Sequence, residues 1–261
     1  MRGNDGPGAA RGAGDDVVVA PQIRPAAGSG RHCTKVEIVR RLPEAAQLSN
    51  CSVTQTLDIT IILPAYNERA AIARTVGETL RYFEARRLEP EIIVAADGTD
   101  GTREWACEMA RTDRRIRVLG DERRRGKGIA VRESVAIASG RWIGYVDADN
   151  KVPIEEFAKV EPHLRAGCEL VVGSRALAGA RIERPQPLYR RVGSKGFHRF
   201  MQTLVGLPGI SDSQCGFKFF QRHVARRLFA CQKIDGYMFD VEILALAQRF
   251  GYRLVEEPVR W

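Results

Sequence analysis

From Asp58 onward, short apolar runs alternate with amphipathic segments, and this alternation limits the possible folds more than any other feature of the chain. The apolar runs predict strands, and the segments between them have the apolar periodicity of helices. The predicted strands cover residues 59–63, 91–95, 116–119, 142–146 and 170–173. The predicted helices cover residues 68–87, 101–112, 127–139 and 153–166. Such alternation indicates an α/β fold with a mostly parallel sheet and helices on both faces.

The segments outside this alternation are less regular. Residues 1–56 are rich in Gly, Ala, Arg and Pro, so we expect a disordered or loosely attached tail. Further along, residues 188–205 and 238–250 predict helices, while residues 217–220 and 254–258 predict strands. We therefore expect one domain over residues 57–261, whose end without a closing helix fits a C-terminal truncation.

Composition places the chain among soluble globular proteins, with 44% hydrophobic and 28% charged residues. No apolar run approaches the ~18 residues that a membrane-spanning helix needs. The six cysteines form no C-x-x-C pair, which argues against a zinc site and a disulfide framework and favours a cytosolic location. The net charge of +9 indicates an anionic partner, either a phosphorylated small molecule or an anionic lipid head group. Nucleic acid is not expected, because no DNA- or RNA-binding signature is present.

Several predicted strands end in polar loops. The first strand breaks at Pro64, with Asn67 as the expected cap of the next helix. The second ends at Asp97, placed to accept a hydrogen bond from a base or ribose, with Asp100 as the expected cap of the helix that follows. Since parallel strands end at one edge of the sheet, where ligands collect, these loops predict a shared binding site. Ordinary strand–turn–helix joints explain the same residues.

The helix expected from residue 127 opens with Gly126-Lys-Gly128 after three arginines. Exposed amide groups, the helix dipole and the Lys127 ammonium would together suit an anion. A solvated basic turn is the alternative interpretation.

Asp147 and Asp149 stand one residue apart at the end of the fourth strand. Two acids this close repel each other unless a cation lies between them, and Mg²⁺ held by carboxylates and substrate phosphates is a common solution. An acidic turn is the simpler alternative.

The chain thus carries these motifs in a fixed order: Pro64-Ala-Tyr-Asn-Glu68, Asp97-Gly-Thr-Asp-Gly-Thr102, Gly126-Lys-Gly128 and Asp147-Ala-Asp149. In order and spacing they resemble the inverting family 2 glycosyltransferases, which have a GT-A (Rossmann-like) fold. Three later motifs narrow the resemblance to dolichyl-phosphate β-glucosyltransferases and polyprenyl-phosphate glycosyltransferases: Gly173-Ser-Arg175, Asp212-Ser-Gln-Cys-Gly-Phe-Lys218 and Phe239-Asp-Val-Glu242. The resemblance covers residues 58–261.

The resemblance implies a nucleotide-sugar donor, with UDP-glucose as the favoured one, and Mg²⁺ or Mn²⁺ as cofactor. Asp147 and Asp149 would hold the metal and the diphosphate. The uridine pocket would be lined by Pro64, Tyr66, Glu68 and Asp97. The chain departs from the family at Ala96, where members usually carry an acid, and in its polar tail, where eukaryotic members begin with a membrane helix.

The implied acceptor is a dolichyl or polyprenyl phosphate. A phosphate monoester has its second pKa near ~6 and is largely dianionic at pH 7, so it needs positioning more than a general base. The cations expected beside it are Arg175, Arg181 and Lys218. Asp212 is the base if one is required, and Glu242 is expected to brace a loop. A solvated surface position also fits Arg181, a loop cap also fits Asp212, and a satisfied helix carboxylate fits Glu242 equally well.

Residues 188–205 predict an amphipathic helix with a basic face. Phe197, Phe200, Met201 and Leu204 fall on one side, opposite Arg191, Lys195, His198 and Arg199. This pattern suits peripheral contact with an anionic membrane, at its cytoplasmic face. A helix packed on the core, with its basic side in solvent, is the alternative.

Two further functions stay open at this point. One is a family 2 transferase that uses another donor, such as GDP-mannose, or a soluble acceptor. The other is an inactive nucleotide-sugar-binding module, which Ala96 and the short C-terminus would suit. The pair Asp147 and Asp149 argues against inactivity, because an inactive module gains nothing from two mutually repelling acids.

Overall fold

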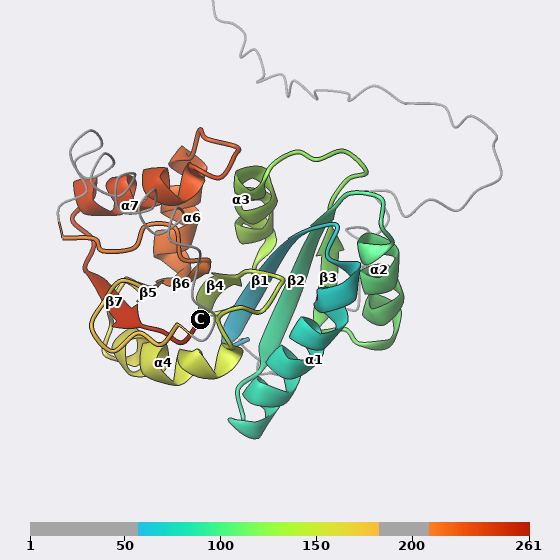
Figure 1. Ribbon diagram of the computed structural model, residues 1–261, viewed down its shortest axis with the longest axis horizontal. Coiled ribbons are helices and arrows are strands. Elements are labelled where there is room, and N and C mark those ends of the chain that lie inside the picture. The colour runs from blue at the N-terminus through green and yellow to red at the C-terminus, as the bar shows by residue number, and fades with distance from the viewer. Residues whose placement is uncertain (1–56, 183–208) are drawn as a thin grey trace, which may run out of the picture. The chain divides into compact units, whose positions relative to one another are not determined.

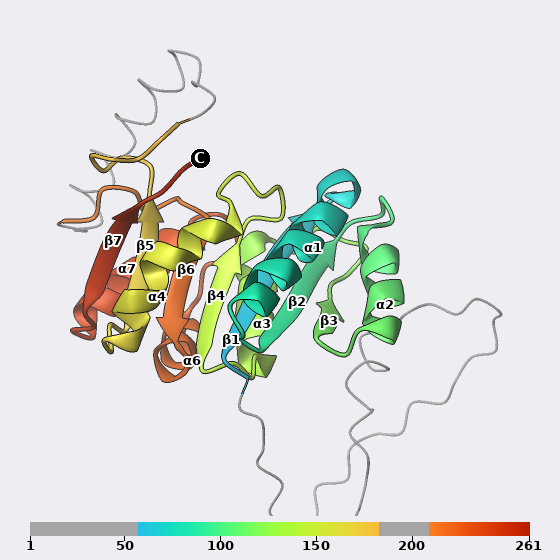
Figure 2. The same ribbon diagram turned by 90° about the horizontal axis from the view of Figure 1, so that it is seen from below.

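Within residues 57–182 and 209–261, which the computed structural model describes, seven strands form one mixed sheet (Figures 1 and 2). The strands are β1 (Ile59–Tyr66), β2 (Pro90–Asp97), β3 (Ile116–Leu119), β4 (Trp142–Val146), β5 (Leu170–Ser174), β6 (Phe217–Gln221) and β7 (Leu254–Pro258). They lie in the order β3-β2-β1-β4-β6-β5-β7. β6 runs antiparallel to β4 and β5, and the other neighbours are parallel. The predicted mostly parallel α/β sheet is confirmed.

Helices cover both faces of this sheet, as expected. They are α1 (Arg69–Ala85), α2 (Thr102–Thr112), α3 (Lys127–Ile137), α4 (Phe157–Arg165), α6 (Arg222–Cys231) and α7 (Phe239–Arg249), with a 3₁₀ turn at Ile154–Glu156 before α4. α1, α2 and α4 pack on one face, and α3, α6 and α7 pack on the other (Figure 2). No helix of the described part has the length and apolar character to cross a bilayer. Helix α6 was not predicted from the sequence, and the predictions for residues 1–56 and 188–205 lie outside the described residues.

The alternation of side chains along β1 shows how the two layers are built. Ile59, Ile61 and Leu63 pack with α1 and α4, whereas Ile62 packs with α3. All four are fully buried. A strand buried on both faces reads as a continuous apolar run, which is why the strand was evident from the sequence.

The order of the strands creates a crevice beside β1. From β1 the chain moves outward to β2 and β3, then returns to place β4 on the opposite side of β1. At such a switch point the loops that leave two neighbouring strands diverge, and ligands of open α/β sheets bind in the gap between them. The gap lies between the loop after Tyr66 and the loop after Val146.

Asp100 joins the loops after β1 and β2. Its carboxylate accepts hydrogen bonds from the backbone N–H of Arg69, at the start of α1, and of Thr102, at the start of α2. The cap predicted at Asp100 is confirmed, but it serves both helices. The cap predicted at Asn67 is wrong: Asn67 adopts φ 55° and its side chain accepts a hydrogen bond from Thr99 N instead.

The start of α3 packs against the loop of residues 232–238, which connects α6 to α7. The N–H of Gly128 donates to the Asp235 carbonyl at 2.8 Å. A Cβ at Gly128 would lie 2.5 Å from the Ile234 carbonyl oxygen, and one at Gly126 would lie 2.4 Å from that of Asp235. The glycines therefore permit close contact between two backbones.

We predict that Gly128→Ala destabilises the protein although alanine favours helices. The added methyl group meets backbone atoms that cannot rotate away, so the free energy of unfolding should fall by about 1–3 kcal/mol. Gly77→Ala in α1 is the matched control, because its Cβ meets only the end of the flexible Arg81 side chain, at 3.3 Å. That change should raise the free energy of unfolding by about 0.4–1 kcal/mol. Denaturant unfolding of both variants tests the contrast, and equal effects would contradict it.

Candidate functional site

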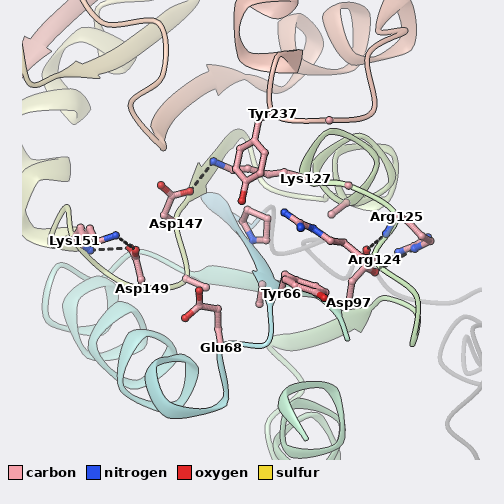
Figure 3. Close-up of a pocket in the computed structure, with 16 residues that line it drawn as sticks. Tyr66, Glu68, Asp97, Arg124, Arg125, Lys127, Asp147, Asp149, Lys151 and Tyr237 are labelled. Atoms are coloured by element: carbon pink, nitrogen blue, oxygen red, sulfur yellow. Dashed lines mark hydrogen bonds and ion pairs between the residues drawn. The ribbon is translucent and has the colours of Figure 1, made fainter. Parts of the chain in front are cut away.

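A pocket of about 660 Å³ occupies the crevice at the ends of β1, β2 and β4 (Figure 3). It contains seven of the residues that the sequence predicted: Pro64, Tyr66, Glu68, Asp97, Lys127, Asp147 and Asp149. In Figure 3, Asp147 and Asp149 stand on one side, and Tyr66, Arg124 and Asp97 stand on the other. The carboxyl ends of the strands thus bring the predicted loops together.

The acid pair is held at the open end of β4. The backbone N–H of Asp147 donates to the Gly216 carbonyl, and a Cβ at Gly216 would lie 2.1 Å from Asp147 Oδ2. The intervening Ala148 is buried, and its carbonyl accepts a hydrogen bond from Thr75 of α1 at 2.8 Å. These contacts leave the side chains of Asp147 and Asp149 exposed by 44% and 29%. Both carboxylates are therefore accessible from the pocket.

Each acid is paired with its own lysine. Lys127 Nζ lies 2.7 Å from Asp147 Oδ1, and Lys151 Nζ lies 2.5 Å from Asp149 Oδ2. Burial disfavours the charged form of Lys127, but Asp240 and then Asp147 outweigh it and raise the lysine's pKa. Burial, followed by repulsion from Asp149, raises the pKa of the neighbouring Glu68. The pKa values of Lys127 and Glu68 therefore depend on burial and on neighbouring carboxylates together.

The residues present fit a hard divalent cation that also binds substrate. Among the described residues, no group of three or more His, Cys, Asp or Glu side chains is arranged to hold a metal. Mg²⁺ usually takes only one or two carboxylates and completes its shell with water and phosphate oxygens. Asp147, nested against Gly216, and the adjacent Asp149 offer such a partial site. Substrate oxygens would supply the remaining ligands.

The glycines at the start of α3 do not frame the anion site that the sequence suggested. The N–H groups of Gly128 and Ile129 both point to the Asp235 carbonyl, at 2.8 and 3.4 Å, so these donors are already engaged. The Lys127 side chain lines the pocket as predicted, beside Gly126, whereas Gly128 is not part of the lining. Glu242 accepts hydrogen bonds from the N–H groups of Lys233 and Ile234, which confirms that it braces a loop.

The opposite wall carries Tyr66 and Asp97. The Tyr66 ring is 45% exposed, and Arg124 Cζ lies 4.6 Å from its centroid, so both present flat surfaces at the pocket. Asp97 is buried and serves the loop after β3: it accepts hydrogen bonds from the N–H groups of Asp121 and Arg125, and from the Arg125 guanidinium. Its predicted contact with the nucleoside stays a prediction.

The residues predicted for the acceptor lie outside the pocket lining. Arg175 donates from Nε and Nη2 to Asp212, at 2.7 and 2.9 Å. Burial opposes the charge on both, yet their pairing raises the pKa of Arg175 and lowers the pKa of Asp212. Trp261 links this pair to the pocket, because its ring centroid lies 5.5 Å from Arg175 Cζ and 6.0 Å from Lys151 Nζ. Arg181 is exposed and bridges through its backbone to Arg260.

Lys218 is placed differently from the sequence expectation. It is the second residue of β6, between Phe217 and Phe219, and its side chain is 0% exposed. β6 is flanked by β4 and β5, and both of its faces are covered, so a side chain on either face is buried. Lys218 instead forms an ion pair with Asp240 at 2.6 Å. The expected contact with an acceptor phosphate has no support in this arrangement.

The structure adds pocket residues that the sequence analysis did not select. Arg124, Arg125, Lys151 and Tyr237 line the pocket, and Tyr237 points into it from the loop of residues 232–238 (Figure 3). The arginine run before Gly126 was a signal for the first two. Tyr237 carried no local signal, since its loop reaches the site only through the packing of α3.

Residues 60–229 match the family model described as glycosyl transferase family 2. Two similar proteins are dolichyl-phosphate β-glucosyltransferases. The one from Trichomonas vaginalis is 39% identical over 77% of this chain and 63% of its own length. The human one is 32% identical over 79% of this chain and 68% of its own. The chain thus spans about two thirds of the length of these relatives.

A similar solved structure is glucosyl-3-phosphoglycerate synthase from Mycobacterium tuberculosis in complex with Mn²⁺ and UDP-glucose. It superposes with a TM-score of 0.57 at 20% identity, over 78% of this chain and 69% of that one. The likeness supports the GT-A fold expected from the sequence. The family match over residues 60–229 shows that the chain belongs to glycosyltransferase family 2.

Proposed function

We propose that this chain transfers glucose, with inversion, from UDP-glucose to a dolichyl or polyprenyl phosphate, with Mg²⁺ or Mn²⁺ as cofactor. The observation that carries the proposal is the pair Asp147 and Asp149 beside Lys127 in the pocket at the β1–β4 crevice. The donor and acceptor follow the relatives, two of which are named dolichyl-phosphate β-glucosyltransferases. The metal follows the synthase solved with Mn²⁺ and UDP-glucose.

In this proposal the pocket binds the donor in two parts. The exposed Tyr66 ring and the Arg124 guanidinium above it offer stacking surfaces for the uracil base. Asp147 and Asp149 would hold the metal, and Lys127 would donate to a diphosphate oxygen. A bound divalent cation would stabilise the negative charge that develops on the departing UDP. Tyr237, which points into the pocket, would contact the sugar.

The acceptor phosphate would bind near Arg175. The lipid phosphate is already dianionic at pH 7, so the attacking oxygen needs no proton removed. Asp212 is also a poor candidate for a general base, because its pairing with Arg175 lowers its pKa. The same pairing fixes the Arg175 guanidinium through two hydrogen bonds. We therefore assign Arg175 to binding the acceptor and Asp212 to positioning Arg175.

The test of the overall proposal is a transfer assay. Purified protein is incubated with Mg²⁺, a polyprenyl phosphate and either labelled UDP-glucose or labelled GDP-mannose, and the lipid is then extracted into organic solvent. Label in the organic phase from UDP-glucose is the expected result. Extractable label from GDP-mannose alone would overturn the donor, label confined to water would overturn the lipid acceptor, and no transfer would favour an inactive binding module.

We predict that Asp149→Ala lowers transfer by at least about a hundredfold, because it removes a ligand of the charge-stabilising cation. The side chain is partly exposed, so the fold should persist, with a circular dichroism spectrum like that of the native chain. Glu108→Gln, an exposed acid on α2, is the control and should keep native activity. Near-native transfer by the Asp149 variant would remove the metal assignment.

Arg175→Lys is expected to raise KM for the polyprenyl phosphate by about tenfold and to leave KM for UDP-glucose nearly unchanged, since lysine keeps the charge but loses the planar fork. Arg115→Lys is the matched control, because Arg115 forms a similar pair with Asp113 before β3, at the opposite edge of the sheet. A rise in KM for the donor instead of the acceptor would refute the assignment.

We also propose that the protein contacts the cytoplasmic face of a membrane through residues 188–205. The support is the basic, amphipathic sequence pattern and the need to meet a lipid-bound phosphate at the bilayer. Replacing Phe200 and Met201 by Ser should reduce co-sedimentation with anionic liposomes several-fold, while the melting temperature stays unchanged. A lowered melting temperature with unchanged sedimentation would show that these side chains belong to the core.

A further inference from the structure

A buried ion pair lies behind the wall of the pocket. Lys218 Nζ is 2.6 Å from Asp240 Oδ1, and the two side chains are 0% and 2% exposed. The Tyr145 hydroxyl donates to the same Asp240 oxygen. Lys218 also donates to the Cys215 carbonyl at 2.6 Å. The network therefore ties β4, β6 and the first turn of α7 together.

This network contacts the surroundings of both Asp147 and Lys127, the two residues proposed to bind the metal and the diphosphate. Cys215 precedes Gly216, against whose backbone the Asp147 carboxylate is nested. On the other side, Lys127 Nζ lies 5.8 Å from the centroid of the Tyr145 ring and 5.9 Å from that of Phe239. Lys127 thus packs against Tyr145, which binds Asp240, and against Phe239, which precedes it in the sequence. Charges alternate in sign from the core to the pocket, in the order Lys218, Asp240, Lys127, Asp147.

Stability alone gives a weak reason for such an arrangement. Desolvating a lysine and an aspartate costs several kcal/mol per ion, and well-packed apolar residues often stabilise a core as well or better. Three phenylalanines flank Lys218 along β6, so an apolar residue would suit the position. A contribution to the neighbouring site is the alternative that their position offers.

We propose that Asp240 is a positioning residue that holds Lys127 toward the donor diphosphate when Asp147 turns to the metal. With a divalent cation bound, Asp147 would turn from the Lys127 ammonium to the cation, and the ammonium would lose this partner. Asp240 stays in place, because Lys218 and Tyr145 both donate to it. Lys127 therefore remains in the wall of the pocket and meets a phosphate oxygen.

This inference rests on the proposed function and leads to a separate prediction about binding. Loss of Asp240 should weaken contacts to the phosphates and spare contacts to the nucleoside. The measurement is equilibrium binding of UDP and of uridine, each in Mn²⁺ buffer, because uridine lacks the diphosphate. A role confined to folding would change both affinities together or lower the melting temperature alone.

Asp240→Asn is expected to weaken UDP binding about tenfold while uridine binding stays the same. Since this variant leaves Lys218 buried without its counter-ion, the double variant Lys218→Met/Asp240→Asn is measured beside it. Removing both charges avoids an unpaired buried ion, so this variant should fold and show the same selective loss. Glu91→Gln is the control. Glu91 is a buried acid at the start of β2, far from the strand ends that form the pocket, so both affinities should stay unchanged.

A double-mutant cycle tests whether Asp240 affects UDP binding by positioning Lys127. Lys127→Met should weaken UDP binding by a similar factor, and adding Asp240→Asn or the Lys218/Asp240 pair to it should cause no further loss. Additive losses, or equal losses for UDP and uridine, would overturn the role of Asp240 and leave the proposed function standing. If the native chain bound UDP no better than uridine, both the donor site and this inference would fail.

Discussion

Two carboxylates one residue apart repel each other, and much of the structure around β4 balances that repulsion. Lys127 from α3 pairs with Asp147, and Lys151 pairs with Asp149. Gly216, before β6, makes room for the Asp147 carboxylate. These contributions come from distant parts of the chain, and the sheet topology brings them together. Two lysines and the space above Gly216 thus offset the repulsion within the acid pair.

The sequence was informative wherever local patterns and sheet geometry are sufficient. Apolar runs identified the strands, because strands covered on both faces lose their polar alternation. Since parallel strands end at one edge, the loops after Tyr66, Asp97 and Val146 were expected to converge, and they line one pocket. Neither inference needs a contact between residues remote in sequence. The same reasoning selected Lys127, because an ammonium at the start of α3 also lies at that edge.

Errors arose where a group's partner lies far along the chain. The amide groups at the start of α3 looked available for an anion, but the Asp235 carbonyl engages them. Asp97 also holds the Arg125 loop, a role that the sequence did not indicate, while its predicted contact with a nucleoside stays a prediction. Lys218 was a different case, since a lysine inside a strand of phenylalanines already indicated burial with a counter-ion. That counter-ion, Asp240, lies in the motif Phe239-Asp-Val-Glu242 and was not considered as its partner.

Under the proposed function, the donor enters a pocket whose charges are already paired. A diphosphate without metal must compete with Asp147 for Lys127 and with Asp149 for Lys151, so much of its attraction is offset by the ion pairs that it breaks. A dication without diphosphate must displace the same lysines and leave them without partners. With both bound, Asp147 and Asp149 would hold the metal and Lys127 and Lys151 would pair with the phosphates, so that every charge would again have a partner. Metal and nucleotide should therefore each strengthen the binding of the other, by the reciprocity that links any two ligands of one site.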